Sequence, residues 1–475
     1  MELVYSDNFC ELYNGNMLDM ISSGHIKPMS IDCIVTDPPY ELNFMGKSWD
    51  NQGVSFQKET WKVCYDALKP GGYLLAFGGS RTYHRIACAI EDAGFEIRDT
   101  VLWVFGQGFP KSMNLSNAIE SKLTTGSANK TQFKNLDGDK VKSGDWGIAK
   151  NSLEYGFRPT DYTADEHLRT VNVNYTTEEA KQWKGWGTCL KPAFEPVIVA
   201  RKPFDGSLVD NVLKYGVGGL NIDECRVPMS SEDYCMIDAK SSKNPTSNYQ
   251  KNEAKKYGDY ALDFATPPNE NGRFPANLIL TYDESDYGEV CGGFPQSKGA
   301  SSQNNYSNGS IYRGQSLQES STKLNGFRDW YNDDGSASRY FYCAKASKKD
   351  REDGLFSEDG KRLNIHPCIK PTDLMQYLVR LVAPKGATIL DPFMGSGSTG
   401  KAVMFENRER NAEYKFIGVE LSEEYLPIAE ARIKFAEGFE LDNKEIEKSQ
   451  KHPRKSVEKS QKSDEKMFEK WGFDV

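Results

Sequence analysis

The alternation of strand-like and helix-like segments in this chain occurs in two separate blocks, one toward each end. Residues 1–105 contain short apolar runs, such as residues 31–36, that alternate with helical patterns, and the same alternation returns over residues 346–440. Strands that alternate with helices are typical of a parallel α/β sheet. Each block is too short to make a complete doubly wound domain, so we expect the two blocks to share one sheet.

The intervening residues 106–345 lack this periodicity and are rich in Asn, Ser, Gly, Tyr and Trp. Short strand candidates remain at residues 196–202 and 275–282, but long regular helices are not indicated. The final stretch, residues 441–475, is rich in Lys, Glu and Ser and is too polar to bury a core. The expected organisation is a split α/β domain, a large second domain inserted within it, and a polar tail.

Composition excludes several classes of protein. With 38% hydrophobic residues among 475, the chain has enough apolar material for a large core, which excludes general disorder. No apolar run reaches the roughly 18 residues that a membrane span needs, and the N-terminus lacks the basic start of a secretory signal. The 10 cysteines form no C-x-x-C pair and the 5 histidines lie at no zinc spacing. We therefore expect a cytoplasmic protein with free thiols, no membrane contact and no bound metal.

A glycine-rich segment follows the strand-like run at residues 388–391 and precedes a helical pattern. Gly395, Gly397 and Gly400 satisfy G-x-G-x-x-G, a spacing that allows a tight turn and leaves helix N–H groups free to bind an anion. Glu420 closes the next strand-like run, where an acid can bind ribose hydroxyls. Together these residues fit a dinucleotide or S-adenosylmethionine.

The same segment nearly fits the phosphate-loop pattern G-x-x-x-x-G-K-[ST], with Lys401 in place. Ala402 replaces the hydroxyl residue that should hold magnesium, so a nucleotide phosphate loop is the weaker alternative. The position of the segment is informative, because an ordinary dinucleotide-binding domain begins with its glycine loop and adds further strands after it. Only one strand-like run follows the loop here, so the remaining strands must come from the N-terminal block. The order of the strands is therefore permuted.

The sequence Asp37-Pro38-Pro39-Tyr40 ends the apolar run at residues 31–36. Proline cannot continue a central strand, so the strand should stop where its carboxyl end meets the crevice of the sheet. The rigid turn would hold the Asp37 carboxylate and the Pro38 carbonyl as two acceptors for the hydrogens of an exocyclic amine on a nucleobase. Tyr40 offers a flat face on which an extruded base could stack. Positioning of this kind suits attack on a sulfonium methyl group, whose leaving group is neutral.

These motifs resemble those of amino-methyltransferases that act on DNA, in particular the β-ordered group, in which the Asp-Pro-Pro-Tyr motif precedes the target-recognition region and the cofactor loop comes last. The resemblance covers residues 11–105 and 366–433 and is strong at residues 37–40 and 391–399. It implies a Rossmann-like methyltransferase sheet in permuted order, interrupted by a large target-recognition insert at residues 106–345. It also implies S-adenosylmethionine as the cofactor and double-stranded DNA as the partner.

Residue roles carry over from the resemblance by position. In the target-amine half, residues 1–105, Asp37 and Pro38 would hold the amine, Pro39 would fix the turn and Tyr40 would stack on the base. In the cofactor half, residues 346–440, the expected ligands surround the glycine loop or lie in a segment that resembles the family's cofactor-carboxylate segment: Asp391, Phe393, Gly395, Gly397, Ser398, Thr399, Glu420 and Lys370.

Within the cofactor half, the resemblance gives individual roles. Asp391 would lie near the amino group of the cofactor, Ser398 and Thr399 would meet its carboxylate, and Glu420 would bind its ribose. One position departs from the family pattern. Where an Asp is common after the first strand, this chain has Asn16, which can accept a hydrogen bond but carries no charge.

Candidate DNA contacts lie in two stretches where basic and aromatic residues are interleaved. Such a mixture suits phosphate contact combined with base stacking or wedging, and the alternative is two strands with solvated charged flanks. The candidates are Lys184, Trp186, Arg201, Lys348, Lys349 and Arg351. The net charge of −9 argues against DNA only as an average over the chain, because these contacts would be local.

The function predicted from the sequence is site-specific methyl transfer from S-adenosylmethionine to the exocyclic amine of a flipped DNA base. Adenine N6 is favoured over cytosine N4, because Asp37 rather than a Ser opens the motif, and that preference is a family association. Two further alternatives stay open: similar chemistry on RNA or protein glutamine, and a nucleotide-binding protein without methyl transfer. A homodimer is compatible with the sequence, which indicates neither the recognition site nor a companion endonuclease.

Overall fold

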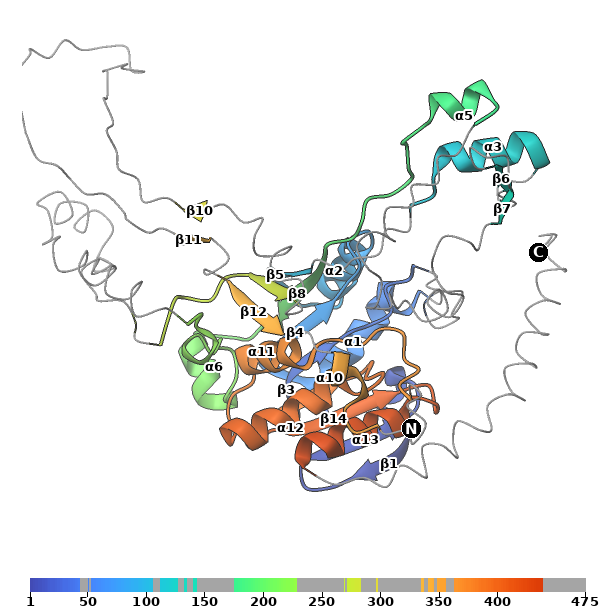
Figure 1. The fold of residues 1–475 in the computed structure, drawn as a ribbon. Coiled ribbons are helices and arrows are strands. Elements are labelled where there is room, and N and C mark those ends of the chain that lie inside the picture. The colour runs from blue at the N-terminus through green and yellow to red at the C-terminus, as the bar shows by residue number, and fades with distance from the viewer. Residues whose placement is uncertain are drawn as a thin grey trace, which may run out of the picture. The chain divides into compact units, whose positions relative to one another are not determined.

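The computed structural model (Figure 1) describes residues 1–42, 50, 53–105, 112–126, 132–134, 140–142, 175–228, 269, 271–282, 296–297, 335–336, 341–345, 348–355 and 363–438. The chain divides into two compact units. Unit 1 consists of Met1–Gly106 together with Phe194–Val475, and unit 2 is Gln107–Ala193.

Unit 1 is built on a 10-stranded sheet with the order β1-β2-β14-β13-β3-β4-β8-β5-β9-β12. Strands β2, β14, β13, β3 and β4 are parallel to their neighbours within this group, whereas β1 and β8 run antiparallel to the strands beside them. The α/β class predicted from the sequence is confirmed. In the order of the sheet, the bounds are Glu2–Ser6, Cys10–Asn14, Lys415–Glu420, Thr388–Asp391, Ile31–Thr36, Leu68–Phe77, Phe194–Arg201, Glu96–Phe105, Leu278–Tyr282 and Tyr342–Lys345.

The chain order of the sheet is permuted, as the position of the glycine loop predicts. Strands β13 and β14, which come last in the sequence, lie between the N-terminal strands β2 and β3. Ile389 of β13 pairs with Cys33 of β3, and Phe416 of β14 pairs with Cys10 of β2. Because β3, β13 and β14 are parallel, their carboxyl ends meet at one edge of the sheet, where ligands of open α/β sheets bind.

The observed division of the chain differs from the insert expected at residues 106–345. Strands β8, β9 and β12 come from that range but belong to the main sheet, and only residues 107–193 separate as a compact unit. The run from Val197 to Ala200 in β8 is buried, because this strand lies between β4 and β5 in the interior of the sheet. Strands β8 and β9 overlap the strand candidates at residues 196–202 and 275–282, but the predominantly polar composition of the range indicated a separate domain. Target recognition by residues 106–345 stays a prediction.

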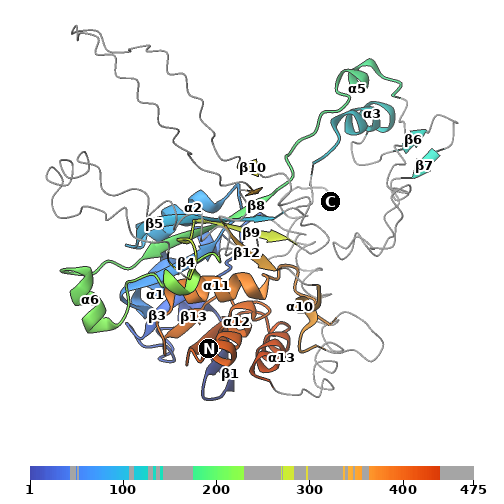
Figure 2. The same ribbon diagram turned by 60° about the vertical axis from the view of Figure 1, so that its left-hand side comes forward.

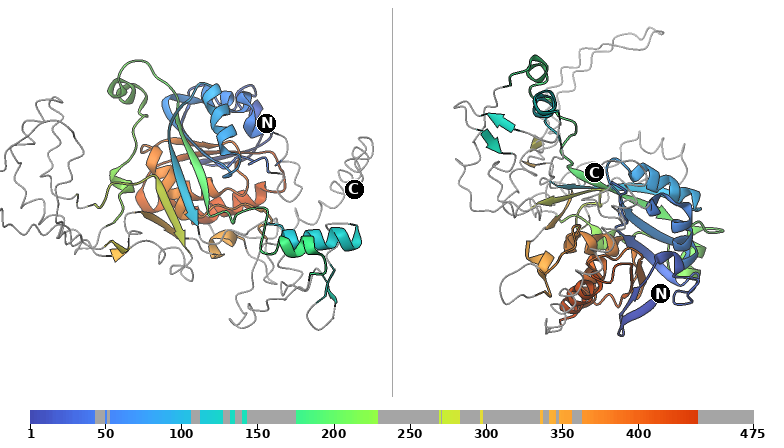
Figure 3. Two further views of the ribbon diagram at one scale, coloured as in Figure 1. Left: turned by 90° about the horizontal axis from the view of Figure 1, so that it is seen from above. Right: turned by 90° about the vertical axis from the view of Figure 1, so that its right-hand side faces the viewer.

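Helices cover both faces of the sheet in unit 1. Cys33 and Val35 of β3 belong to the apolar cluster that α11, α12 and α13 complete, whereas Ile34 between them belongs to the cluster of α1 and α2. This alternation follows from the two-residue period of a strand. Figures 2 and 3 show the blue helices and the orange to red helices on opposite sides of the sheet. The bounds are Lys58–Ala67 for α1, Tyr83–Asp92 for α2, Thr372–Val382 for α11, Ser398–Arg410 for α12 and Leu426–Glu437 for α13.

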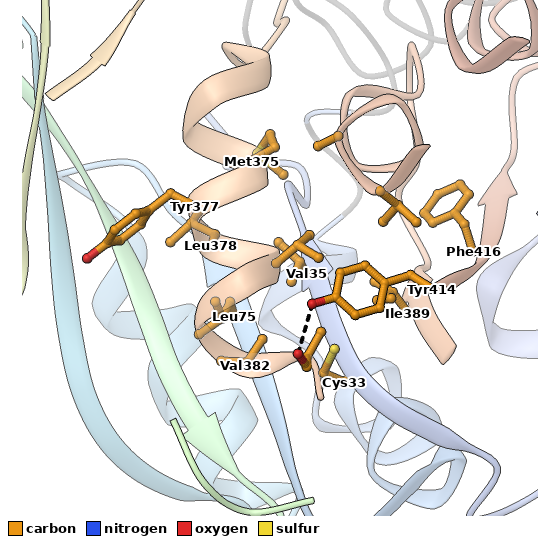
Figure 4. Packing of buried hydrophobic residues seen from close by; sticks show 14 of the residues in the cluster. Cys33, Val35, Leu75, Met375, Tyr377, Leu378, Val382, Ile389, Tyr414 and Phe416 are labelled. Atoms are coloured by element: carbon orange, nitrogen blue, oxygen red, sulfur yellow. Dashed lines mark hydrogen bonds between the residues drawn. The ribbon is translucent and has the colours of Figure 1, made fainter. Parts of the chain in front are cut away.

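Helix α11 packs its apolar side onto the centre of the sheet. Figure 4 shows Met375 and Leu378 of this helix beside Val35, and all three side chains are buried. Tyr414 lies in the same layer, and its hydroxyl donates a hydrogen bond of 3.0 Å to the carbonyl of Ala383. This packing fixes α11, and with it the segment that immediately precedes the helix.

The remaining elements are short. In unit 1 they are α6 Leu208–Tyr215, α10 Lys348–Glu352, the 3-10 helices Met17–Asp19, Val54–Phe56 and Asp223–Cys225, and a separate pair of strands, β10 Gln296–Ser297 and β11 Gly335–Ser336. Unit 2 contains α3 Leu115–Thr125, α5 Glu178–Gln182 and the paired strands β6 Gln132–Lys134 and β7 Lys140–Lys142.

Unit 2 is held together around a buried carboxylate. Glu120 of α3 accepts hydrogen bonds from the backbone N–H and hydroxyl groups of Thr176 and Thr177. Burial alone would raise the pKa of Glu120, but these hydrogen bonds lower the pKa to about 2. Glu120 therefore stays ionised at neutral pH and ties α3 to the start of α5.

Membrane-spanning helices, metal-binding clusters and thiols concern the described residues as follows. No helix among them has the length and apolar character to cross a bilayer. They contain no cluster of three or more His, Cys, Asp or Glu side chains that could hold a metal ion. The cysteines among them, including Cys33 in the core and the exposed Cys88, are free thiols.

Candidate active site

The Asp-Pro-Pro-Tyr motif directly follows strand β3 and therefore lies at the carboxyl edge of the sheet. All six residues of the strand, Ile31–Thr36, are buried, and the strand ends directly before Asp37. The following prolines lack a backbone N–H, which prevents the strand from continuing. The Asp37 side chain is 20% exposed, so its carboxylate is accessible at the edge but mostly shielded from water.

Lys370 lies between two carboxylates at this edge. Its Nζ atom is 2.5 Å from Oδ2 of Asp37 and 3.3 Å from Oε2 of Glu195, and the lysine side chain is 7% exposed. Burial alone would lower the pKa of Lys370, but the charges of Asp37 and Glu195 hold that pKa above its usual range. Lys370 is therefore a buried, permanent cation shared by two acids.

Aromatic rings surround this cation. The Nζ atom of Lys370 lies 5.3 Å from the ring centroid of Tyr40, 4.9 Å from that of Phe77 and 6.0 Å from that of Trp103. The hydroxyl of Tyr40 donates to Oε2 of Glu195 at 2.8 Å. Burial, reinforced by the nearby carboxylates, raises the pKa of Tyr40 well above its usual value. Tyr40 is therefore a neutral hydrogen-bond donor with a fixed ring.

Among the described residues, one oxygen of Asp37 has no hydrogen-bond partner. Its Oδ2 atom binds Lys370, whereas Oδ1 is buried and unpaired within the described part of the chain. A buried carboxylate oxygen without a donor is costly, so such an atom indicates a place for a ligand donor. The carbonyl of Pro39, close by in the motif, is used internally, because it accepts a hydrogen bond from the hydroxyl of Ser55.

The glycine loop follows β13, the neighbour of β3 in the sheet. Gly395 and Gly397 have φ angles of +55° and +74°, in the left-handed region that favours glycine. A Cβ atom at Gly397 would lie 2.9 Å from the Cα atom of Ala429 in α13, so the loop packs directly on that helix. Helix α12 begins at Ser398, and no side chain caps its N-terminus. Its first N–H groups are therefore available to an anion.

Asp391 stabilises this loop through hydrogen bonds. Its Oδ1 atom accepts hydrogen bonds from the Thr36 hydroxyl at 2.7 Å and the Phe393 N–H at 3.1 Å, and its Oδ2 atom accepts one from the Thr399 hydroxyl at 2.6 Å. Burial raises the pKa of Asp391 to about 6. The side chain is 2% exposed, so the structure shows a link between β3, the loop and α12 where the sequence suggested a direct cofactor contact.

Glu420 stands at the end of β14, beside β13. Its Oε2 atom accepts a hydrogen bond of 2.8 Å from the N–H of Gly395, and its Oε1 atom accepts one of 2.8 Å from the N–H of Ser422. Burial raises the pKa of Glu420 to about 7 despite these hydrogen bonds. Each oxygen still has a lone pair for a ligand hydroxyl, which keeps Glu420 compatible with the predicted ribose contact.

Arg432 is a loop contact that the sequence motifs do not reveal. This fully buried side chain of α13 donates from Nη1 to the Ser396 carbonyl at 2.6 Å, to the Ser396 hydroxyl at 3.0 Å and to the Ser398 hydroxyl at 3.2 Å. Burial lowers the pKa of Arg432 to about 10, so the guanidinium remains charged at neutral pH. Arg432 is one of four charged residues in the sequence of α13, so the sequence neither singles it out nor indicates its partner.

Lys401 does not act as the lysine of a phosphate loop. Its Nζ atom lies 2.5 Å from Oδ1 of Asp350 and 3.0 Å from Oδ2 of Asp353, and its side chain is 1% exposed. The ion pairs hold α10 against α12. Because the ammonium is buried among carboxylates, it is not presented to a ligand, which removes the main support for the phosphate-loop alternative.

Two residues of the segment before α11 contact different motifs. Lys370, expected in the cofactor-carboxylate segment, instead contacts Asp37 of the target-amine motif. His366, four residues earlier, lies against the loop, because a Cβ atom at Gly395 would be 2.9 Å from His366 Nε2. Burial lowers the pKa of His366 to about 4, so its imidazole is neutral at pH 7. Sequence spacing alone could not separate these two positions.

Asn16 has a local structural role. Its Oδ1 atom accepts a hydrogen bond of 3.0 Å from the N–H of Leu18 and so caps the 3-10 helix Met17–Asp19. The preceding residue, Gly15, donates its N–H to the carbonyl of Glu420 at 3.0 Å. Replacement of the common Asp by Asn therefore preserves the cap while removing a charge from this edge of the sheet.

The predicted DNA contacts fall into three groups. Lys184 and Trp186 of unit 2 are exposed, and the Trp186 ring meets that of Trp183 edge to face, with centroids 5.1 Å apart. Arg201 is not a free cation, because it donates to Oε2 of Glu96 at 2.8 Å and lies over the ring of Phe204. Its position in the sheet explains this difference from the expectation.

The second basic stretch is described only in part. Arg351 donates from Nη2 to the carbonyl of His366 at 2.9 Å, so it helps to fix the segment before α11. Lys348 and Lys349 belong to α10, but their side chains lie outside the described part of the structure. The predicted DNA contacts at these two lysines therefore stay predictions.

Comparison with known proteins places this geometry in a family. A model of the DNA methylase family of N6 and N4 methyltransferases matches residues 31–431. The orphan methyltransferase M.BamHII of Bacillus amyloliquefaciens is 31% identical over 124 residues, which are 22% of this chain and 44% of that protein. The type II methyltransferase M.HpaI of Haemophilus parainfluenzae is 28% identical over 159 residues, 32% of this chain and 49% of that protein. The chain thus spans about half the length of these curated relatives.

Two solved structures are similar to this chain. The complex of M1.HpyAVI with S-adenosylmethionine has a TM-score of 0.34 at 14% identity, covering 90% of this chain and 100% of that one. The cytosine-N4-specific PvuII DNA methyltransferase has a TM-score of 0.38 at 13% identity, covering 94% and 93%. The resemblance drawn from the motifs is confirmed by the family match over residues 31–431, which includes both Asp37-Pro-Pro-Tyr40 and the glycine loop. The chain belongs to the DNA methylase family.

Proposed function

We propose that this chain is an S-adenosylmethionine-dependent methyltransferase that modifies the N6 amine of a flipped adenine at a specific site in double-stranded DNA. The observation that carries the proposal is the Oδ1 atom of Asp37, which is buried and unpaired within the described part of the chain. This acceptor lies at the carboxyl end of β3, and the glycine loop follows the adjacent parallel strand β13. An acceptor for an amine and a loop for an anionic ligand therefore share one edge of the sheet.

The residues of the loop fit the cofactor. The uncapped N-terminus of α12 offers N–H groups, with the hydroxyl of Ser398, to a carboxylate. Glu420 provides carboxylate oxygens for ribose hydroxyls, and the partly buried ring of Phe393 provides an apolar surface. When bound, the cofactor supplies a methyl group on a positively charged sulfur, with a neutral leaving group. Asp391 keeps the loop in place through Thr36 and Thr399.

The target half of the site prepares the amine. Oδ1 of Asp37 accepts one N–H of the amine, and the Pro38 carbonyl can accept the other, which draws the nitrogen lone pair away from the ring of the base. Tyr40, with its hydroxyl fixed by Glu195, supports the base by stacking. The chemistry then depends on positioning and on preorganised acceptors, without a metal ion.

Adenine is preferred to cytosine in this proposal because Asp37 opens the motif. That preference comes from the family association, and cytosine N4 remains the alternative substrate. Recognition of the DNA sequence is assigned to residues outside the main sheet, where unit 2 exposes Lys184 and Trp186. Lysine can contact phosphates, and an exposed tryptophan can stack on or wedge between bases.

Nucleoside analysis tests the proposal directly. The protein is incubated with unmethylated DNA of mixed sequence and S-adenosylmethionine, the DNA is digested, and the nucleosides are identified by mass. We expect N6-methyladenine with wild-type protein, none with Asp37→Ala, and normal levels with Asp92→Ala, which changes an exposed acid at the end of α2. Detection of N4-methylcytosine instead of N6-methyladenine would identify cytosine, and not adenine, as the base that is modified. Absence of any methylated DNA base, or methylation of RNA alone, would refute it.

A further inference from the structure

We propose that Lys370 and Glu195 are positioning residues that hold Asp37 ionised, with one free oxygen directed at the target amine, and keep the net charge of the group at −1. Asp37, Glu195, Lys370 and Tyr40 are called the acceptor clamp. The inference rests on the proposed methyl transfer and deepens it. It assigns to Lys370 a role at the target amine in place of the expected role at the cofactor carboxylate.

The contacts within the acceptor clamp orient both the Asp37 carboxylate and the Tyr40 ring. Lys370 binds Oδ2 of Asp37, whereas Oδ1 is buried and has no hydrogen-bond partner among the described residues. Glu195 binds Lys370 at 3.3 Å and accepts the Tyr40 hydroxyl at 2.8 Å through the same Oε2 atom. The acceptor oxygen and the stacking ring are therefore oriented by one connected set of contacts.

Three chain segments supply the clamp. Asp37 and Tyr40 follow β3, Glu195 belongs to the antiparallel strand β8, and Lys370 lies just before α11. The hydroxyl of Thr82 adds a further contact by donating to the Tyr40 carbonyl at 2.8 Å. Since these segments pack on the same sheet, the site forms only when the main sheet is complete.

The charges explain why the lysine is needed. Two carboxylates that share a partly shielded site disfavour each other's ionisation, so the pKa of one of them rises when no cation lies between them. A single ammonium placed between Asp37 and Glu195 allows both to stay ionised, which leaves a net charge of −1. Without the lysine, protonation of Asp37 would convert the acceptor of the amine hydrogen into a poorer one.

The net charge of −1 matches the reaction. As the bond from the amine nitrogen to the methyl carbon forms, the bond from that carbon to sulfur breaks, and sulfur keeps the electron pair as a neutral thioether. The nitrogen thereby becomes positively charged and then gives one proton to Oδ1 of Asp37, from which it passes to water. A clamp with a net negative charge stabilises the nitrogen cation relative to the neutral amine.

The test compares three variants: Lys370→Met, Glu195→Gln and the double variant that combines them. Lys370→Met leaves two carboxylates without a cation, so we expect the acidic limb of the kcat–pH profile to move up by about 1 to 3 pH units. Glu195→Gln should lower kcat on the order of 10-fold with little change in that limb. The double variant again carries a charge of −1 at Asp37, and its acidic limb should return toward that of the wild type.

Binding of S-adenosylmethionine, measured by calorimetry, separates the two roles of Lys370. If the lysine belongs to the acceptor clamp, Lys370→Met should bind the cofactor within about 2-fold of wild type, whereas loss of a direct charged contact costs 10-fold or more. The control is Lys69→Met, which removes a lysine paired with Asp32 at 2.6 Å at the start of β3. This control should change neither the pH profile nor cofactor affinity.

Thermal unfolding without DNA or cofactor tests the clamp even if methyl transfer is absent. In Lys370→Met, a carboxyl whose pKa is raised in the folded state binds protons there that the unfolded chain releases. The unfolding temperature of this variant should therefore fall, relative to wild type, as pH rises above about 4, and the double variant, in which Asp37 lacks the second carboxylate, should show a smaller fall. Wild type that methylates no DNA would refute the proposed function alone. A normal acidic limb and a normal unfolding profile in Lys370→Met would refute the clamp.

Discussion

Substitution of Gly397 by alanine should weaken both the fold and cofactor binding. The residue has a φ angle of +74°, and a Cβ atom there would lie 2.9 Å from Cα and 3.0 Å from Cβ of Ala429. The left-handed conformation costs alanine about 1 to 2 kcal/mol, and forcing an extra methyl group against packed backbone costs about 1 to 3 kcal/mol more. The expected total loss of unfolding free energy is therefore about 2 to 5 kcal/mol.

A matched glycine separates the two contributions. Gly386 has a φ angle of +76°, and nothing lies within 4 Å of a Cβ atom placed there. Gly386→Ala should therefore lose only the conformational part, about 1 to 2 kcal/mol. Urea unfolding of the two variants and the wild type gives the difference between them, which reports the contact of the loop with α13.

Cofactor affinity provides the second measurement. To relieve the contact with Ala429, the loop and the N-terminus of α12 must shift, and these supply the N–H groups assigned to the cofactor carboxylate. Calorimetry should show a loss of affinity of about 10-fold or more for Gly397→Ala, since one charge-assisted hydrogen bond is worth roughly 1.5 to 3 kcal/mol. Gly386→Ala should bind normally. Equal losses of stability and affinity in the two variants would refute the packing argument.

Other substitutions test the remaining parts of the site. Asp37→Ala should lower kcat by about 100-fold or more while leaving the affinity for S-adenosylmethionine unchanged in calorimetry, and comparable loss in both would contradict its role at the amine. Because burial raises the pKa of Glu420 to about 7, cofactor affinity should rise as pH increases through this value and the carboxylate ionises. Glu420→Gln should abolish that rise, and a persisting rise would place the titrating group elsewhere. Lys184→Ala should reduce the salt dependence of DNA binding by about one unit of slope, and Trp186→Ala should weaken binding without changing the slope, both in fluorescence titrations. An unchanged affinity in both variants would remove unit 2 from the DNA interface.

Residues that are adjacent in sequence were enough to predict the local structure at each of the two motifs. The buried strand Ile31–Thr36 followed by two prolines has a single physical outcome, a strand that stops at the edge of the sheet with Asp37 behind it. The glycine loop likewise predicts a strand, a turn and a helix in that order, and its late position predicts the permuted sheet. In both cases, the residues that determine the structure are neighbours in sequence.

Contacts between distant segments were not predictable from such signals. Glu195 reaches Tyr40 across 155 positions in the chain, and its strand lies in a range whose polar composition suggested a separate domain. Arg432 binds the loop from α13, and an arginine in a helix gives no indication of its partner. Lys370 was placed with the cofactor because of its motif, whereas the packing of α11 brings it to Asp37. Tertiary packing decided these three positions.

The permuted chain order also determines how hydrogen bonds connect the two halves of the site. Strand β3, from the N-terminal block, and strand β13, from the C-terminal block, become neighbours, and the Thr36 hydroxyl reaches Asp391 at 2.7 Å across that boundary. Asp391 in turn holds Thr399 at the start of α12. The residue directly before Asp37 is thus tied to the loop assigned to the cofactor. A displacement of either block would separate acceptor and loop, so relative placement of amine and methyl group depends on the sheet itself and not on the connections between its strands.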